Sequence, residues 1–180
     1  MFSKWRYECA IPLPDRRLRQ SSVPRPDSTS STPSPGAVVA AVTTFATISA
    51  MLPAWAMFLG WVAYSTSGAT TRERVANLIS FLLGLGVGVG TGLLIAFLTP
   101  MLGDAATPLA VFGDVVLVLS LRSLRPINNP LAWFLGLTTF FASAQAPSLS
   151  LLAALAIAGL IGALAAGLAI VLQSRIQPAA

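Results

Sequence analysis

Hydrophobic residues dominate the chain from residue 37 onward, in runs broken by prolines, charged residues or short polar stretches. A helix needs about 20 apolar residues to cross a hydrocarbon core of ~30 Å. The pattern therefore predicts membrane helices, of which those over 75–99 and 149–172 have comfortable lengths. For the shorter runs we expect one of three solutions: flanking polar residues extend the helix, the bilayer is locally thinner, or the segment is re-entrant and does not cross fully. In chain order the runs cover residues 37–52, 54–68, 75–99, 108–121, 130–145 and 149–172.

The positions of the basic residues favour six membrane crossings. If all runs cross, the tail and the even-numbered loops share one side. The odd-numbered loops, around Pro53, 100–107 and 146–148, then contain no Lys or Arg. The positive-inside rule places both termini in the cytoplasm, whereas a five-span topology would split the basic clusters between the two faces. Beyond the tail, the basic residues on the cytoplasmic side are Arg72, Arg74, Arg122, Arg125 and Arg175.

Two parts of the chain resemble each other. The segment Ala56-Met57-Phe58-Leu59-Gly60 aligns with Ala132-Trp133-Phe134-Leu135-Gly136, with four identities in five, at an offset of 76 residues. Residues of the third and sixth runs align at an offset of 75. Shared membrane composition is the alternative explanation, because runs of Gly, Ala and Leu coincide easily. The second alignment pairs Gly84, Leu85, Gly92, Leu93 and Ile95 with Gly159, Leu160, Gly167, Leu168 and Ile170.

A repeat of three segments has an architectural consequence. A unit with an odd number of spans inserts its second copy upside down, so the halves, about 37–99 and 108–172, form an inverted repeat with a pseudo-two-fold axis in the membrane plane. Many transporters build a site near the midplane in this way. We expect an all-α integral membrane protein of six transmembrane segments, some short or broken, with a site near Leu52–Ser67 and Asn129–Gln145.

Composition removes most soluble and enzymatic functions. The 180 residues are 55% hydrophobic and only 9% charged, whereas a soluble domain carries roughly 25% charged residues. The chain has no His to serve as general base or metal ligand. A single cysteine, Cys9, cannot build a disulfide framework or a metal site. We therefore expect no enzyme activity, no catalytic residues, no metal and no cofactor.

Residues 1–36 differ from the rest of the chain. They hold six of the 11 basic residues and a Ser/Thr/Pro run, a composition that cannot bury enough apolar surface to fold. We interpret them as a disordered cytoplasmic tail, with an organelle transit peptide or a start codon assigned too far upstream as alternatives. Acidic residues and prolines separate the cations, which favours attraction to the lipid bilayer over nucleic-acid binding.

Asp114 is the one acidic side chain inside an apolar run. A carboxylate at mid-depth in a bilayer costs on the order of 2.5–3.5 kcal/mol on insertion scales, so it should face a partner or a wet cavity. The functional interpretation is a substrate or proton site. The structural interpretation is a neutral Asp hydrogen-bonded to another helix.

Other polar residues offer a hydrophilic path. Asn128-Asn129-Pro130 fits an N-cap followed by Pro at the first helical position, or an amide pair aimed at a solute from a helix N-terminus. Ser and Thr side chains often bond back to their own helix instead. The candidates for a substrate or ion path are Asp114, Asn128, Asn129, Tyr64, Thr138 and Gln145.

Small residues at spacings of four recur in the third and sixth runs, as Gly84, Gly88 and Gly92 and as Gly159, Ala163 and Gly167. Small residues at this spacing let membrane helices approach closely, and we favour helix packing over a pore-lining role. The same glycine-rich helices offer a route to a homo-oligomer. The packing candidates are Gly84, Gly88, Gly92, Gly159 and Gly167.

Three apolar motifs carry a resemblance to a known family. They are Leu52-Pro-Ala-Trp-Ala-Met-Phe-Leu-Gly-Trp-Val-Ala-Tyr64 with the glycine-rich run after it, Pro130-Leu-Ala-Trp-Phe-Leu-Gly136, and Phe140-Phe-Ala-Ser143. The chain resembles, over roughly residues 38–175, the small bacterial inner-membrane proteins called domain of unknown function 1097. The resemblance implies an integral inner-membrane protein and supplies no catalytic residues. The long N-terminal tail departs from the family's compact pattern.

Two functions fit these observations. The first is a small-solute channel or transporter with a site between the two repeats. The second is a non-transporting membrane scaffold or accessory subunit, which would have a dry interior and an exposed glycine-rich face for a partner.

Overall fold

The computed structural model describes residues 34–66, 70–121, 123 and 127–176. Contacts divide the chain into two units, Met1–Pro33 and Ser34–Ala180. The first unit, which holds most of the predicted tail, lies outside the described residues, as do Arg122 and Arg125.

Each predicted apolar run of the second unit forms a helix, and the described residues contain no strand. Two helical stretches are long and apolar enough to cross a membrane: Thr71–Leu121 and Leu149–Ile176. The elements are α2 (Pro35–Ser49), α3 (Ala54–Ser65), α4 (Thr71–Leu102), the 3₁₀ helix η1 (Gly103–Ala105), α5 (Ala106–Leu121), α6 (Pro130–Ala142) and α7 (Leu149–Ile176).

Side-chain caps define where several helices begin. Thr70 and Glu73 form a capping box at the start of α4, in which the Thr70 hydroxyl accepts from the Glu73 amide and the Glu73 carboxylate accepts from the Thr70 amide. The Ser34 hydroxyl accepts from the Ala37 amide at the start of α2. These bonds satisfy backbone N–H groups that have no partner inside the helix.

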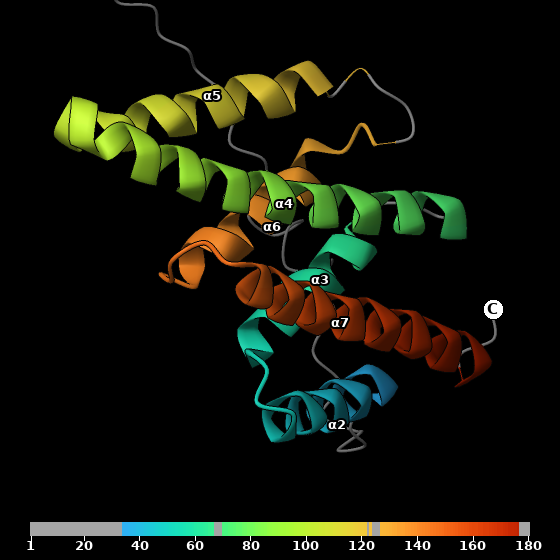
Figure 1. The fold of residues 1–180 in the computed structure, drawn as a ribbon. Coiled ribbons are helices and arrows are strands. Elements are labelled where there is room, and N and C mark those ends of the chain that lie inside the picture. The colour runs from blue at the N-terminus through green and yellow to red at the C-terminus, as the bar shows by residue number, and fades with distance from the viewer. Residues whose placement is uncertain (1–33, 67–69, 122, 124–126, 177–180) are drawn as a thin grey trace, which may run out of the picture. The chain divides into compact units, whose positions relative to one another are not determined.

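The break expected between residues 100 and 108 is smaller than the sequence suggested. Helix α4 continues through Pro100 to Leu102, because a proline in the last turn removes only one backbone hydrogen bond. Gly103, with φ of 54°, then turns the chain, since glycine adopts this conformation without steric strain. After η1 the chain enters α5 directly, and α4 and α5 form a hairpin (Figure 1).

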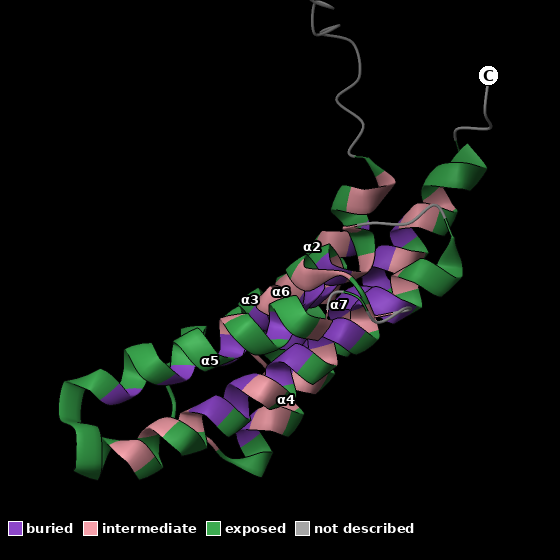
Figure 2. Ribbon diagram, turned by 90° about the horizontal axis from the view of Figure 1, so that it is seen from above, coloured by how far each residue is buried: buried purple, intermediate pink, exposed green. Residues whose placement is uncertain are grey.

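Each short central helix packs along a long helix. Within the second unit α3 lies against α7 and α6 lies against α4, while α2 covers the outer side of α7 and α5 the outer side of α4 (Figure 1). Buried residues concentrate on α3, α4, α6 and α7, and α5 is exposed over most of its surface (Figure 2). The outer faces carry large apolar side chains such as Phe97, Phe112 and Leu164. A surface of this kind suits hydrocarbon better than water.

Glycines allow the central helices to touch backbone to backbone. A methyl group added at Gly60 of α3 would overlap the backbone of Gly159 in α7, and one added at Gly162 would overlap the carbonyl oxygen of Met57. In the α4–α6 pair, Gly136 meets the backbone of Phe81 and Gly84 in the same way. Such close approach is the usual role of small residues between membrane helices.

Candidate functional site

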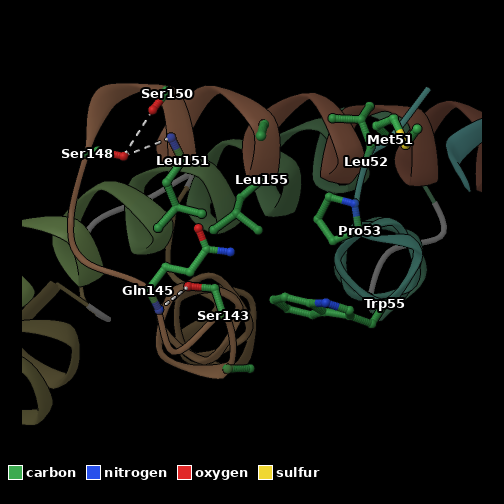
Figure 3. A pocket seen from close by; sticks show the side chains of 12 residues that line it. Met51, Leu52, Pro53, Trp55, Ser143, Gln145, Ser148, Ser150, Leu151 and Leu155 are labelled. Atoms are coloured by element: carbon green, nitrogen blue, oxygen red, sulfur yellow. Dashed lines mark hydrogen bonds between the residues drawn. The ribbon is translucent and has the colours of Figure 1, made fainter.

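A pocket of about 500 Å³ lies where α3 begins, α6 ends and α7 begins (Figure 3). Its lining combines the indole of Trp55, aliphatic side chains and polar groups from the segment between α6 and α7. None of the lining side chains is charged. The lining includes Met51, Pro53, Trp55, Ser143, Gln145 and Ser148.

Two residues with unusual backbone conformation lie at this pocket. Met51 has φ of 57° and Ala144 has φ of 50°, and among the described non-glycine residues these two alone have positive φ. A left-handed conformation costs a non-glycine residue roughly 1–2 kcal/mol. Met51 lines the pocket, and Ala144 stands between the lining residues Ser143 and Gln145. Backbone strain of this kind concentrates at functional sites.

The polar groups of the pocket differ in whether they already have a hydrogen-bond partner within the protein. The Ser143 hydroxyl donates to the Phe140 carbonyl at 2.7 Å, and the Ser148 hydroxyl accepts from the Leu151 amide at 3.2 Å. The Gln145 side chain makes no hydrogen bond to the described residues and reaches toward Leu151 and Leu155 (Figure 3). Its amide can therefore donate to and accept from a bound molecule.

Two helix N-termini add to the polarity of the pocket. Helix α3 begins after Pro53, which provides no side-chain cap, and α7 begins after Ser148. The N-terminal end of a helix carries partial positive charge and unpaired N–H groups. The pocket therefore offers hydrogen-bond donors and partial positive charge, while no charged side chain lines it.

Asp114 lies elsewhere, between α5 and α4. It is 8% exposed, and its Oδ1 is 2.6 Å from the hydroxyl of Thr91 on α4. Its other oxygen, Oδ2, is buried and has no hydrogen-bond partner among the described residues. The predicted carboxylate thus meets a polar partner on a neighbouring helix, and it does not line the pocket.

Asn129 caps α6 and also joins it to α4. Its Oδ1 accepts from the Leu131 amide at 3.1 Å, and its Nδ2 donates to Oδ1 of the buried Asn77 at 3.0 Å. Pro130 occupies the first helical position. The hydrogen bonds of Asn129 are those of a helix N-cap, which was one of the two interpretations of Asn128-Asn129-Pro130.

We expect Asn129→Ala to destabilise the protein by about 1–2 kcal/mol, because it removes both the cap and the bond to Asn77. The neighbouring Asn128 is exposed, so Asn128→Ala should change stability by less than about 0.5 kcal/mol. Chemical unfolding in detergent, followed by circular dichroism, measures both. Equal effects of the two substitutions would contradict the capping role.

The remaining candidates do not join one site. Tyr64 lies beside Gly167 of α7, whose added Cβ would stand 3.6 Å from the Tyr64 hydroxyl oxygen. Thr138 is exposed on α6. The six residues proposed for a single path therefore occupy separate places, with Gln145 in the pocket, Asp114 at the α4–α5 contact and Asn129 at the start of α6.

The glycines singled out in the sequence lie inside the chain's own helix contacts. Gly84 faces the backbone of Trp133, while Gly88 and Gly92 face the ring of Phe140. In contrast, a Cβ added at Gly86 or Gly90 would meet nothing within 4 Å. The face that the scaffold hypothesis assigned to a partner is thus covered, at Gly88, by α6 of the same chain.

Sequence reasoning missed several residues of these contacts. Thr91 was overlooked because it stands in a glycine-rich apolar run, where a hydroxyl usually bonds to its own helix. Met51 and Ala144 carry no sequence signal, since their importance lies in backbone angle. Trp133 is buried, and its N–H donates to the Ile127 carbonyl at 3.0 Å.

Comparison with known proteins gives a family and no function. No curated protein and no solved structure matches the chain. The family described as "Protein of unknown function (DUF1097)" matches residues 36–170, which comprise every helix except the first residue of α2 and the last turns of α7. The match confirms the resemblance drawn from the apolar motifs, and the chain therefore belongs to the DUF1097 family.

Proposed function

We propose that the protein is a membrane carrier for a small neutral polar solute, which binds in the pocket between α3, α6 and α7. The observation that carries the proposal is the convergence, at one uncharged pocket, of two strained residues and the unpaired amide of Gln145. Ligand pockets characteristically combine apolar walls with a few directed polar groups.

The proposed architecture is an inverted repeat of two three-helix halves. Gly60 and Gly136 are equivalent in the sequence repeat, as are Gly84 and Gly159. Gly60 lies against Gly159 and Gly136 lies against Gly84, so equivalent residues make equivalent contacts. The pairing of helices follows the same rule, since α3–α7 corresponds to α6–α4 and α2–α7 to α5–α4. Chance similarity of apolar segments would not produce matched contacts, which supports the repeat.

The proposal places the protein in the inner membrane as a six-span protein with cytoplasmic termini. In this orientation the pocket opens on the side whose loops lack Lys and Arg, around Pro53 and residues 146–148. The pocket floor includes Leu151 and Leu155, which belong to an apolar buried cluster with Leu85 and Phe140. A closed apolar floor favours a carrier that changes conformation over an open channel.

The test is solute exchange in reconstituted vesicles. We expect wild type to exchange at least one labelled solute from a panel of neutral polyols, amides and monosaccharides. We expect Gln145→Leu to lower the exchange about tenfold, as for loss of ~1.4 kcal/mol of hydrogen bonding. Gln173→Leu, on the exposed end of α7, serves as the matched control. Silence of wild type across the panel, or equal loss in both variants, would reject the proposal.

A further inference from the structure

The hydroxyl of Thr91 lies within hydrogen-bond distance of two oxygen atoms, one of them from Asp114. The Thr91 hydroxyl oxygen is 2.6 Å from Asp114 Oδ1 and 2.9 Å from the Val87 carbonyl oxygen of its own helix. A threonine hydroxyl has one hydrogen, so it can donate to one of these two oxygens. If Asp114 were ionised, two acceptors would compete for that hydrogen, and Oδ2 would be a buried charged oxygen without a partner.

Two other buried threonines donate to a backbone carbonyl of their own helix. The hydroxyls of Thr47 and Thr139 each donate to the carbonyl four residues earlier, at 2.7 Å. If the Thr91 hydroxyl donates to Val87 in the same way, its oxygen can accept a hydrogen bond from a protonated Asp114, and the buried, unpartnered Oδ2 then carries no charge. We propose that Asp114 is a reversible proton-binding site which is protonated in this conformation, and that it couples solute movement to protons. The coupling rests on the proposed carrier function, whereas the proton site does not.

The fold itself does not require a carboxyl group at this position. Helix α2 packs on α7 as α5 packs on α4, and there the contact includes an apolar cluster of Val39 with Ala165 and Ala169. The contact of α5 with α4 differs in that it contains a buried carboxyl group and a hydroxyl. Ionisable groups inside membrane segments are rare and often mark ion or proton pathways.

Among the residues that the structure describes, no charged group is positioned to hold the ionised form of Asp114. Helix α5 packs against α4, α6 and η1. Helix α6 contains no titratable residue, and the charged residues of α4 lie in its first turn, ending at Arg74, about 25 Å from Thr91 at 1.5 Å per residue. Asp104 in η1 precedes Asp114 by about 15 Å of helix. Arg122 lies outside the described residues.

Proton release therefore implies movement. The O–H bond of Asp114 breaks, its electron pair stays on the carboxylate, and the proton passes to water. The resulting carboxylate needs water or another donor, and no described residue donates to the buried Oδ2 in this conformation. Deprotonation favours a conformation in which α5 moves away from α4 at this position.

Infrared spectroscopy of the full chain in lipid vesicles tests the proton site without any transport assay. We expect the carbonyl stretching band of a protonated carboxylic acid, shifted in D₂O, which Asp114→Asn removes and Asp104→Asn, at an exposed residue, retains. Thr91→Val keeps the acid but removes its acceptor, so the band should move to higher frequency. If Asp114→Asn fails to fold, the shift of the band in Thr91→Val still tests whether the protonated acid is Asp114. Absence of the band in wild type, or its loss in Asp104→Asn, would overturn the proton site.

Uptake driven by a pH gradient tests the coupling. We expect a gradient to drive solute accumulation by wild type and Asp104→Asn, and to drive none by Asp114→Asn. A wild type that has the infrared band but moves no solute removes the carrier function and the coupling together, and the proton site stands. A wild type that exchanges solute but never accumulates it in response to the gradient overturns the coupling alone.

Discussion

Replacing Gly162 by alanine should separate α3 from α7 and cost at least about 3 kcal/mol of stability. Overpacking a core usually costs 1–3 kcal/mol, and more where nothing can relax. Here the added methyl group overlaps the carbonyl oxygen of Met57 and stands 2.8 Å from the amide nitrogen of Trp61. Both are backbone atoms of α3, so no side chain can rotate to make room, and the helices themselves must shift.

Gly86→Ala provides the matched control for this prediction. A Cβ at Gly86 would meet nothing within 4 Å, and alanine is favoured over glycine in a helix by about 1 kcal/mol. We therefore expect Gly86→Ala to be neutral or stabilising. Unfolding in detergent, monitored by circular dichroism, measures both variants. If Gly162→Ala were as stable as Gly86→Ala, the backbone contact between α3 and α7 would not exist.

If the protein is the carrier proposed above, filling the pocket should strongly reduce solute exchange. Ala154 lines the pocket from α7, and a tryptophan there would occupy the space in front of Leu151 and Leu155. Because the solute and the indole cannot share that space, we expect Ala154→Trp to reduce exchange in vesicles by at least about tenfold, equivalent to ~1.4 kcal/mol.

The neighbouring residue supplies the control for the filled pocket. Ala153 is exposed and does not line the pocket, so Ala153→Trp adds the same side chain to an outer face. We expect exchange by this variant to stay close to that of wild type. Equal inhibition by both substitutions would show that the pocket is not where the solute binds.

The sequence predicted the helices well because apolar runs and their breaks are local features. Asn129-Pro130 indicated where α6 begins, since a cap and a fixed proline φ act within a single turn. The turn after α4 was predicted less well. Whether Pro100 ends a helix depends on its distance from Gly103, where the chain reverses, and not on proline alone.

The candidate site was harder to predict than the helices. Gln145 was identified as a polar residue in an apolar run, but the pocket also depends on the backbone angles of Met51 and Ala144, which leave no mark on composition. Asp114 was conspicuous by its charge. Its partner Thr91 lies 23 residues away on another helix, and a spacing of that kind follows from the three-dimensional packing.

The short helix α3 packs against α7, and the short helix α6 packs against α4. This pairing has a consequence for biosynthesis. Helix α6 emerges after α4, so its partner is already in place when Gly136 is made. Helix α3 emerges early, and the helix that carries Gly159 and Gly162 is the last of the described helices to be synthesised. A nascent chain that stops before α7 leaves the small-residue face of α3 uncovered. The insertion machinery or lipid must shield that face until translation of α7 is complete.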